Sequence, residues 1–283
     1  MDLFARQRET FIKNCIEFDT PRLQSEEYPS EVKVDSDIKY GKHVLDIYWP
    51  QNDKAKSDSK DAFFLIHGGA FVYGSKELDK RFGMYLALES GLPVVNVNYT
   101  LMPEGDLKVI LDELFQAVGF IADNYGFNRL HYTGDSAGGY LAFIMSCLTM
   151  DKSAREEAGL PGDIKVTVGS VNPVCGCYKN RKFGFPGWYF EKDNKLPKFC
   201  YNLFDLVKRT GSPSAAIVTG DKDFLRKENQ KLKNLYDEMG IKAEFIDAVS
   251  NDDEQAFHVF PIAQPTKPQA FEAVRMFARN AIG

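Results

Sequence analysis

The sequence predicts an α/β protein in which one mostly parallel sheet of eight strands is flanked by helices. After residue 60, apolar runs rich in β-branched and aromatic residues alternate with helical patterns, which is typical of parallel strands joined by right-handed crossovers. The 283 residues are 44% hydrophobic and 27% charged, as in a soluble globular protein that buries one core. We therefore expect a single domain over residues 1–283.

The elements follow in order along the chain. Two runs at 31–37 and 43–49, joined by Tyr40-Gly41-Lys42, predict an antiparallel hairpin, and the polar loop 53–60 follows. Hydrophobic periodicity then predicts strands at 61–66, 93–99, 129–134, 164–171, 215–219 and 243–249, and helices at 78–89, 107–124, 137–150, 225–239 and 269–281.

Two segments stand outside this alternation and predict a small cap. Residues 1–28 have the pattern of a helix with apolar residues on one side. Residues 175–213 lack a clear crossover helix, and positions 183–204 within them hold eight aromatic residues. This excess favours either a lid over an apolar pocket or an insertion that packs its rings on the main domain. The sequence leaves both open.

Charge and length exclude several classes of protein. Lys and Arg total 35 and Asp and Glu total 40, so the net charge of −5 makes nucleic-acid binding unfavourable. The longest uncharged stretch, 136–150, is shorter than the ~20 residues of a membrane span, so no span is expected. The first 15 residues mix both charge signs where a signal peptide would be apolar, which favours a cytoplasmic protein.

The five cysteines are an odd number and show neither a C-x-x-C pair nor a histidine at zinc-ligand spacing, which favours a reducing cytoplasm. We expect neither a metal nor a cofactor. Cys175 and Cys177 are two positions apart, which permits a redox or metal role. Packing as small residues in a loop is the alternative, and it is the more common situation for such residues.

A nucleophile is predicted at Ser136, in Gly134-Asp135-Ser136-Ala137-Gly138-Gly139 between a strand and a helix. A G-x-S-x-G sequence at such a turn projects the serine hydroxyl above the sheet, and small residues permit the sharp turn. A glycine-rich crossover with Ser136 as an ordinary helix cap is the alternative.

A second glycine turn, His67-Gly68-Gly69-Ala70-Phe71, follows the strand at 61–66. Successive glycines let main-chain N–H groups face a cavity, which is what an oxyanion hole requires.

The base is sought among four histidines. His67 belongs to the glycine turn, His43 to the hairpin and His131 to a strand, which leaves His258 on the loop after the last strand. Loops at the carboxyl ends of parallel strands commonly form active sites. The orienting acid is expected after the strand at 215–219, where either Asp221 or Asp223 could serve.

Three further segments add to these motifs: Tyr99-Thr100-Leu101-Met102-Pro103-Glu104, Gly-x-x-Asp-x-Leu at 220–225 and a final His-x-Phe. The whole set resembles the α/β-hydrolase esterases of the hormone-sensitive-lipase type. The resemblance covers residues 40–283 and implies the α/β-hydrolase fold, with a cap from the two odd segments. It implies Ser136 as nucleophile, Asp223 as acid, His258 as base, and an oxyanion hole of amides from Gly68, Gly69 and Ala137. Two positions depart from the family pattern: Ala70 replaces its third glycine, and Thr100 replaces its arginine.

The resemblance implies a serine carboxylesterase that acts through an acyl-enzyme on a small ester. We expect Phe71 and Trp188 to contact the substrate, acyl chains from acetyl to hexanoyl to be preferred, and the protein to be a monomer or homodimer. A formamidase or small amidase on the same fold, and a non-catalytic ligand-binding relative, are the alternatives.

Overall fold

The computed structural model describes residues 3–56, 58–179 and 195–282. Within them one sheet of eight strands has the order β1-β2-β4-β3-β5-β6-β7-β8. Strand β2 is antiparallel to both β1 and β4, and the other neighbouring pairs are parallel, which confirms the predicted sheet and entry hairpin. The strands are β1 Val32–Tyr40, β2 His43–Pro50, β3 Asp61–Ile66, β4 Val94–Val97, β5 Arg129–Asp135, β6 Thr167–Val174, β7 Ala215–Gly220 and β8 Ala243–Ala248.

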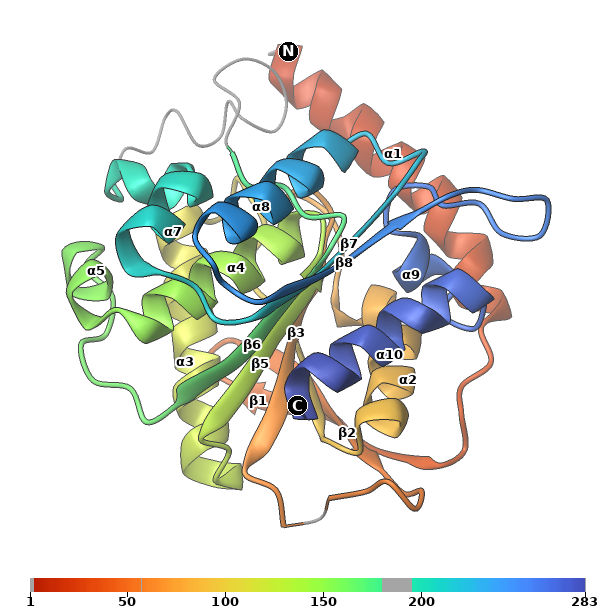
Figure 1. Cartoon of the computed structure of the whole chain (residues 1–283), viewed down its shortest axis with the longest axis horizontal. Coiled ribbons are helices and arrows are strands. Elements are labelled where there is room, and N and C mark those ends of the chain that lie inside the picture. The colour runs from red at the N-terminus through yellow and green to blue at the C-terminus, as the bar shows by residue number, and fades with distance from the viewer. Residues whose placement is uncertain (1–2, 57, 180–194, 283) are drawn as a thin grey trace.

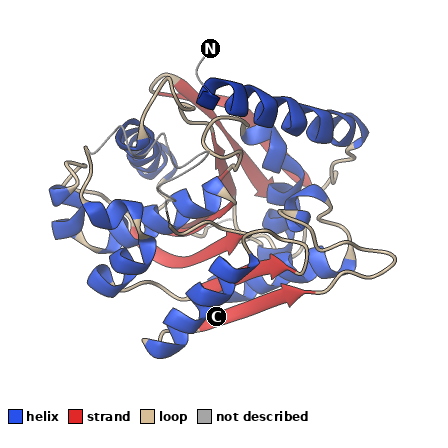
Figure 2. Cartoon of the chain, turned by 90° about the horizontal axis from the view of Figure 1, so that it is seen from above, coloured by secondary structure: helices blue, strands red, loops and turns tan. Residues whose placement is uncertain are grey.

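Helices cover both faces of this sheet, and a separate buried apolar cluster lies under each layer (Figures 1 and 2). One layer contains α2 Lys80–Ser90, α9 Phe260–Ala263 and α10 Pro268–Ile282. The opposite layer contains α3 Leu107–Tyr125, α4 Ala137–Met150, α7 Leu203–Thr210 and α8 Arg226–Glu238, with the short α5 Lys152–Glu157 after α4. This arrangement confirms the predicted α/β-hydrolase architecture.

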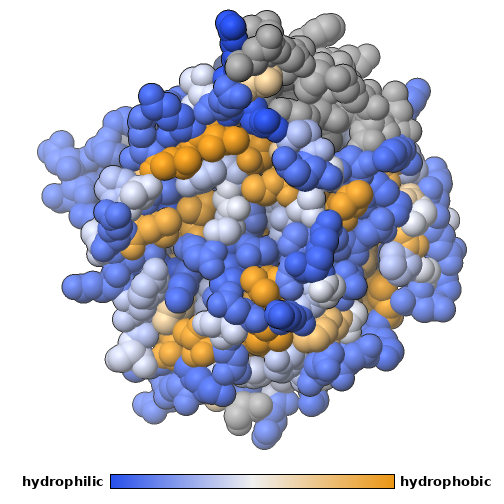
Figure 3. All heavy atoms as spheres, turned by 180° about the vertical axis from the view of Figure 1, so that it is seen from behind, coloured by the Kyte–Doolittle hydropathy of each residue, from blue (hydrophilic) through white to orange (hydrophobic). Residues whose placement is uncertain are grey.

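The N-terminal helix α1, Leu3–Ser25, lies outside both layers, as Figure 1 shows in red. It was predicted as a helix over 1–28. In the described residues, no helix combines the length and the apolar character needed to cross a bilayer. The surface in Figure 3 is largely polar, with apolar side chains in separate small groups, as is usual for a folded domain.

Three strands differ from their predicted ranges by two residues or more. Strand β1 runs to Tyr40, three residues beyond the predicted end at residue 37. Strand β4 ends at Val97 rather than at residue 99, because the side chain of Asn98 accepts the Lys76 amide and the Tyr99 hydroxyl donates to the carbonyl of His67. Strand β6 begins at Thr167, three residues later than predicted, where the amide of Thr167 donates to Asn128 beside the start of β5.

The 175–213 segment contains α7, a helix that the sequence pattern did not predict. Its residues 180–194, with Trp188 and four other members of the aromatic cluster, lie outside the described residues. The predicted contact of Trp188 with substrate therefore stays a prediction.

Candidate active site

The turn between β5 and α4 holds Ser136 in a strained main-chain conformation, with φ 50° and ψ −111°. Its amide donates to the carbonyl of Val174 at 2.9 Å. A Cβ on Gly138 would lie 1.9 Å from the Ile66 carbonyl oxygen, and one on Gly134 would lie 2.3 Å from the same atom. Glycine is required at both positions because the turn packs directly against the end of β3. The sequence therefore supplies the small residues that this turn needs, and Ser136 lines a cavity.

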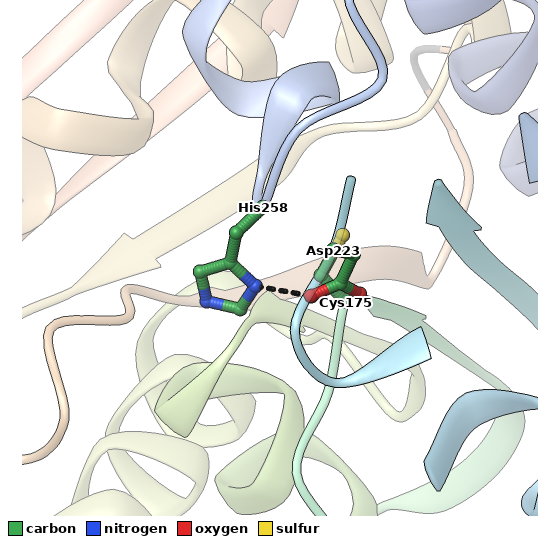
Figure 4. Close-up of side chains that lie close together, drawn as sticks. All are labelled: Cys175, Asp223 and His258. Carbon is green, nitrogen blue, oxygen red and sulfur yellow. Dashed lines mark hydrogen bonds and ion pairs between the residues drawn. The ribbon is translucent and has the colours of Figure 1, made fainter. Parts of the chain in front are cut away.

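His258 lies between Ser136 and Asp223. Its Nε2 is 2.9 Å from the Ser136 hydroxyl. Its Nδ1 is 2.7 Å from Asp223 Oδ1, the contact drawn as a dashed line in Figure 4. An ionised carboxylate only accepts hydrogen bonds, so Nδ1 carries the proton and Nε2 is left to accept one from the serine. The structure thus brings the three predicted residues into one hydrogen-bonded series.

Asp223 is buried and accepts two further hydrogen bonds, from the Thr219 hydroxyl at 2.7 Å and the Leu225 amide at 2.9 Å. Burial alone would raise the pKa of Asp223, but the bonds from His258, Thr219 and Leu225 outweigh it and the pKa is lowered. Asp221 accepts the Ser250 hydroxyl at 2.6 Å instead. Of the two carboxylates that the sequence left open, the structure brings Asp223 to His258.

The loops that carry acid and base touch along their main chains. The amide of Lys222 donates to the carbonyl of Ala256 at 3.2 Å, and Lys222 and Phe257 form an isolated parallel bridge. A Cβ on Gly220 would lie 2.2 Å from that same carbonyl oxygen. Glycine at position 220 therefore allows the close approach that sets the distance between Asp223 and His258.

The glycine turn after β3 differs from the prediction at one residue. The Gly68 amide donates to Asp135 Oδ1 at 2.7 Å, so it is engaged away from the cavity. Gly69, Ala70 and Ala137 line the cavity beside Ser136, and within the described residues their amides have no hydrogen-bond partner. Ala70 replaces Gly68 as a candidate oxyanion donor. Its retained N–H was visible in the sequence, but the partner of Gly68 was not.

Aromatic and polar side chains support this turn from behind. The Tyr99 ring stacks on His67 with centroids 4.4 Å apart. Burial lowers the pKa of His67 to about 4, so the ring is neutral at neutral pH. Thr100, at the position of the family's arginine, bonds Glu113 through its hydroxyl at 2.7 Å and its amide at 2.8 Å. The carboxylate of Glu113 thus supports the loop that lacks the arginine.

Two buried carboxyl groups, Asp79 and Asp135, lie behind the nucleophile. Burial raises the pKa of Asp135 to about 6. Burial, followed by the nearby charge of Asp135, raises the pKa of Asp79 well above its usual range. Like charges this close in a buried site do not both ionise readily, which favours one proton retained by the pair.

The cavity above Ser136 has a volume of about 720 Å³. One wall is a single face of α1, with Phe11, Cys15, Phe18 and Arg22 at helical spacing. Phe71 lines the cavity, as predicted for a residue that contacts substrate. The sequence predicted a cap helix at 1–28 but did not show which of its residues line the cavity, because only their helical spacing signalled a shared face.

Cys175 lies next to the acid, as Figure 4 shows, and its Sγ, an Asp223 oxygen and a His258 nitrogen lie within 4.8 Å of one another. Such a group resembles a metal site. However, burial, followed by the charge of Asp223, raises the pKa of the Cys175 thiol well above its usual range. A metal ligand must be the thiolate, so this environment disfavours a metal and fits the packing role that the sequence left open. Cys177 lines the cavity, and none of the five cysteines forms a disulfide.

Comparison with known proteins agrees with this architecture. Residues 63–176 match a family model described as alpha/beta hydrolase fold. Esterase B from Lactobacillus rhamnosis superposes with a TM-score of 0.86 at 20% identity, covering 98% of this chain and 95% of that chain. An esterase from Pyrobaculum calidifontis gives a TM-score of 0.69 at 21% identity, covering 99% and 92%.

A form of esterase B inhibited by a tributyrin phosphonate superposes with a TM-score of 0.85 at 21% identity, covering 99% of this chain and 97% of that chain. At these identities the likeness concerns the fold. The chain therefore has the α/β-hydrolase fold, as its motifs predicted.

Proposed function

We propose that the protein is a serine carboxylesterase that hydrolyses esters of short acyl chains, acetyl to hexanoyl. The observation that carries the proposal is the hydrogen-bonded series Ser136, His258 and Asp223 at the base of a largely apolar cavity. A non-catalytic binding protein has no need to align a hydroxyl, an imidazole and a buried carboxylate in this way.

In the proposed reaction, Ser136 Oγ attacks the ester carbonyl carbon while His258 Nε2 accepts the hydroxyl proton. Asp223 holds the imidazole in the required tautomer and stabilises the imidazolium that forms. His258 then donates the proton to the leaving alcohol oxygen, which leaves an acyl group on Ser136. A water molecule, deprotonated by the same imidazole, releases the acid and restores the serine.

In each tetrahedral intermediate the carbonyl oxygen becomes negatively charged, and the amides of Gly69, Ala70 and Ala137 are proposed to donate hydrogen bonds to it. They line the cavity beside Ser136 and have no other partner in the described residues. Fixed donors of this kind stabilise charge that develops in the transition state more than charge in the ground state. The Gly68–Asp135 bond holds the turn from which two of them project.

The preference for short acyl chains is supported by the wall beside the oxyanion turn. Phe71 is buried there, and its ring packs edge-to-face on Tyr140 with centroids 5.6 Å apart. Both residues line the cavity, so a long chain on this side would meet two fixed rings. The esterase B relative inhibited by a tributyrin phosphonate is consistent with short acyl groups in this fold.

The test is Ser136→Ala, assayed on p-nitrophenyl acetate. The side chain loses one oxygen, so the fold should persist, while kcat should fall by about 10³ to 10⁶, as in other serine hydrolases. Ser153→Ala, at an exposed serine of α5, is the control and should keep full activity. Near-normal hydrolysis by the Ser136 variant would refute the proposal. Faster turnover of formanilide than of phenyl formate by the unmodified protein would instead favour an amidase.

A further inference from the structure

An exposed phenyl ring lies directly against the proposed base. Phe224 follows Asp223 in the chain, and its ring centroid is 4.1 Å from that of His258 at an interplanar angle of 40°. It is 72% exposed, the highest value among the large hydrophobic residues of the described chain. Phe224 also lines the cavity, so its exposed face is turned at least in part toward the space where a ligand would bind.

Two more phenyl rings continue this surface. Phe257 precedes His258 and lines the cavity, and Phe18 of α1 packs edge-to-face on it with centroids 5.9 Å apart at 78°. Phe18 is itself 51% exposed. The three rings come from α1, the loop after β7 and the loop after β8, so the fold gathers them around the base from distant parts of the sequence.

The reaction itself decides which part of an ester meets these rings. His258 Nε2 has to deliver a proton to the leaving oxygen, so the alcohol part of the substrate lies on the side of His258. The acyl part extends from the same carbonyl carbon away from the leaving oxygen, and we place it against Phe71 and Tyr140, which line the cavity. A cavity of about 720 Å³ is in the range that holds drug-sized ligands, and a short acyl group alone leaves much of it unfilled.

We propose that Phe18, Phe224 and Phe257 form a binding subsite for the alcohol part of the ester, and that the protein acts on esters of ring-containing apolar alcohols. This rests on the proposed esterase function. An aromatic alcohol would cover apolar surface that is otherwise in contact with water and would pack against phenyl rings edge-on or offset. The protein thus selects its substrate chiefly through the alcohol rather than the acyl chain.

The test compares kcat/KM for benzyl acetate and ethyl acetate. Both release primary alcohols of similar basicity and share the acetyl group, so the ratio reports recognition of the alcohol. Phe224→Ala should lower the benzyl-to-ethyl ratio about three- to tenfold, the size of one aromatic contact. Phe18→Ala should lower it in the same direction. Val249→Ala, at another exposed apolar residue that does not line the cavity, should leave the ratio unchanged.

A second comparison separates the alcohol side from the acyl side. p-Nitrophenyl acetate and p-nitrophenyl butyrate share their alcohol, so Phe224→Ala should leave the ratio of their kcat/KM values within about twofold. A shift in this acyl ratio with a constant benzyl-to-ethyl ratio would overturn the subsite, because the rings would then contact the acyl chain. If neither ratio shifts in a folded, active variant, the subsite is refuted while the esterase function stands. Failure of the Ser136→Ala test would remove the function itself.

Discussion

The base of the cavity and its α1 wall are built in opposite ways. The base consists of turns after β3 and β5, whose function depends on the main chain: Ser136 and Ala70 have positive φ, and Gly138 has no room for a Cβ. The α1 wall presents only side chains at helical spacing, and Phe18 on it is half exposed. Main-chain constraints restrict which residues a position accepts, whereas an open wall accepts many. Substitutions at the base of the cavity should therefore lower stability or activity far more than substitutions on α1.

The largest effect is expected at Asp223, in the loop after β7, whose carboxylate contacts His258. Asp223→Asn should lower kcat by about 10⁴, because an amide no longer holds the His258 tautomer that leaves Nε2 free to accept the serine proton. Asp221→Asn is the matched control. Its carboxylate bonds Ser250 rather than His258, so the loss should be less than about tenfold. The kcat values of both folded variants are compared on one short ester. A larger loss in Asp221→Asn than in Asp223→Asn would mean that Asp221 is the acid.

Gly138→Ala should destabilise the protein by about 4 kcal/mol or more, because its Cβ would lie 1.9 Å from a main-chain oxygen that cannot rotate away. Gly119→Ala in α3 is the control, since nothing lies within 4 Å of its added Cβ. It should stabilise the helix by about 1 kcal/mol. Urea unfolding measures both, and equal stabilities of the two variants would contradict the packing argument.

The pH dependence of stability should reveal the buried carboxyl pair behind the nucleophile. A pKa of about 6 for Asp135, against 3.8 for the free side chain, means that between these values the folded state keeps a proton that the unfolded state releases. Stability from this group is therefore lost as pH rises from about 4 to 6, by about 3 kcal/mol in total. Asp135→Asn keeps an acceptor for the Gly68 amide but does not titrate.

The difference in unfolding free energy between this variant and the unmodified protein reports the coupled pair Asp79 and Asp135. The subtraction cancels the opposite trend from His67 and His131, because burial lowers the pKa of each to about 4. The variant should gain on the unmodified protein as pH rises from about 4. The gain should continue above pH 6, because the charge of Asp135 raises the pKa of Asp79 only in the unmodified protein. A difference that does not vary with pH would show that Asp135 ionises normally.

The smallest effect is expected on the α1 wall. Cys15→Ala should change kcat/KM for p-nitrophenyl acetate by less than about threefold, because this side chain lines the cavity without contacting the proposed reacting groups. Burial raises the pKa of the Cys15 thiol to about 11, so iodoacetamide should label it slowly at pH 8. Mass spectrometry follows the labelling. A loss of activity above tenfold would mean that α1 helps to position the reacting groups.

The same contrast explains what the sequence could predict. Ser136 was identified because its turn needs small residues in a particular order, and His258 by elimination and by its place after the last strand. The alternating pattern predicted the sheet and most helices. Gly68 was assigned an exposed amide because nothing local reveals that Asp135, 67 positions later, accepts its hydrogen bond. Spacing alone did not separate Asp221 from Asp223. That choice depends on Ser250 and His258, which come from other loops. The residues of α1 escaped notice because a helix face has no motif.

The distance along the chain between Ser136 and His258, 122 positions, has a consequence for how the protein folds. The strands that precede Ser136 can pair early, but the base arrives only when β7, β8 and their loops have joined the sheet. Contacts of such long sequence separation form slowly. During refolding, helical and sheet structure should therefore appear before any hydrolysis, and the return of the proposed esterase activity would report the docking of the last sheet edge.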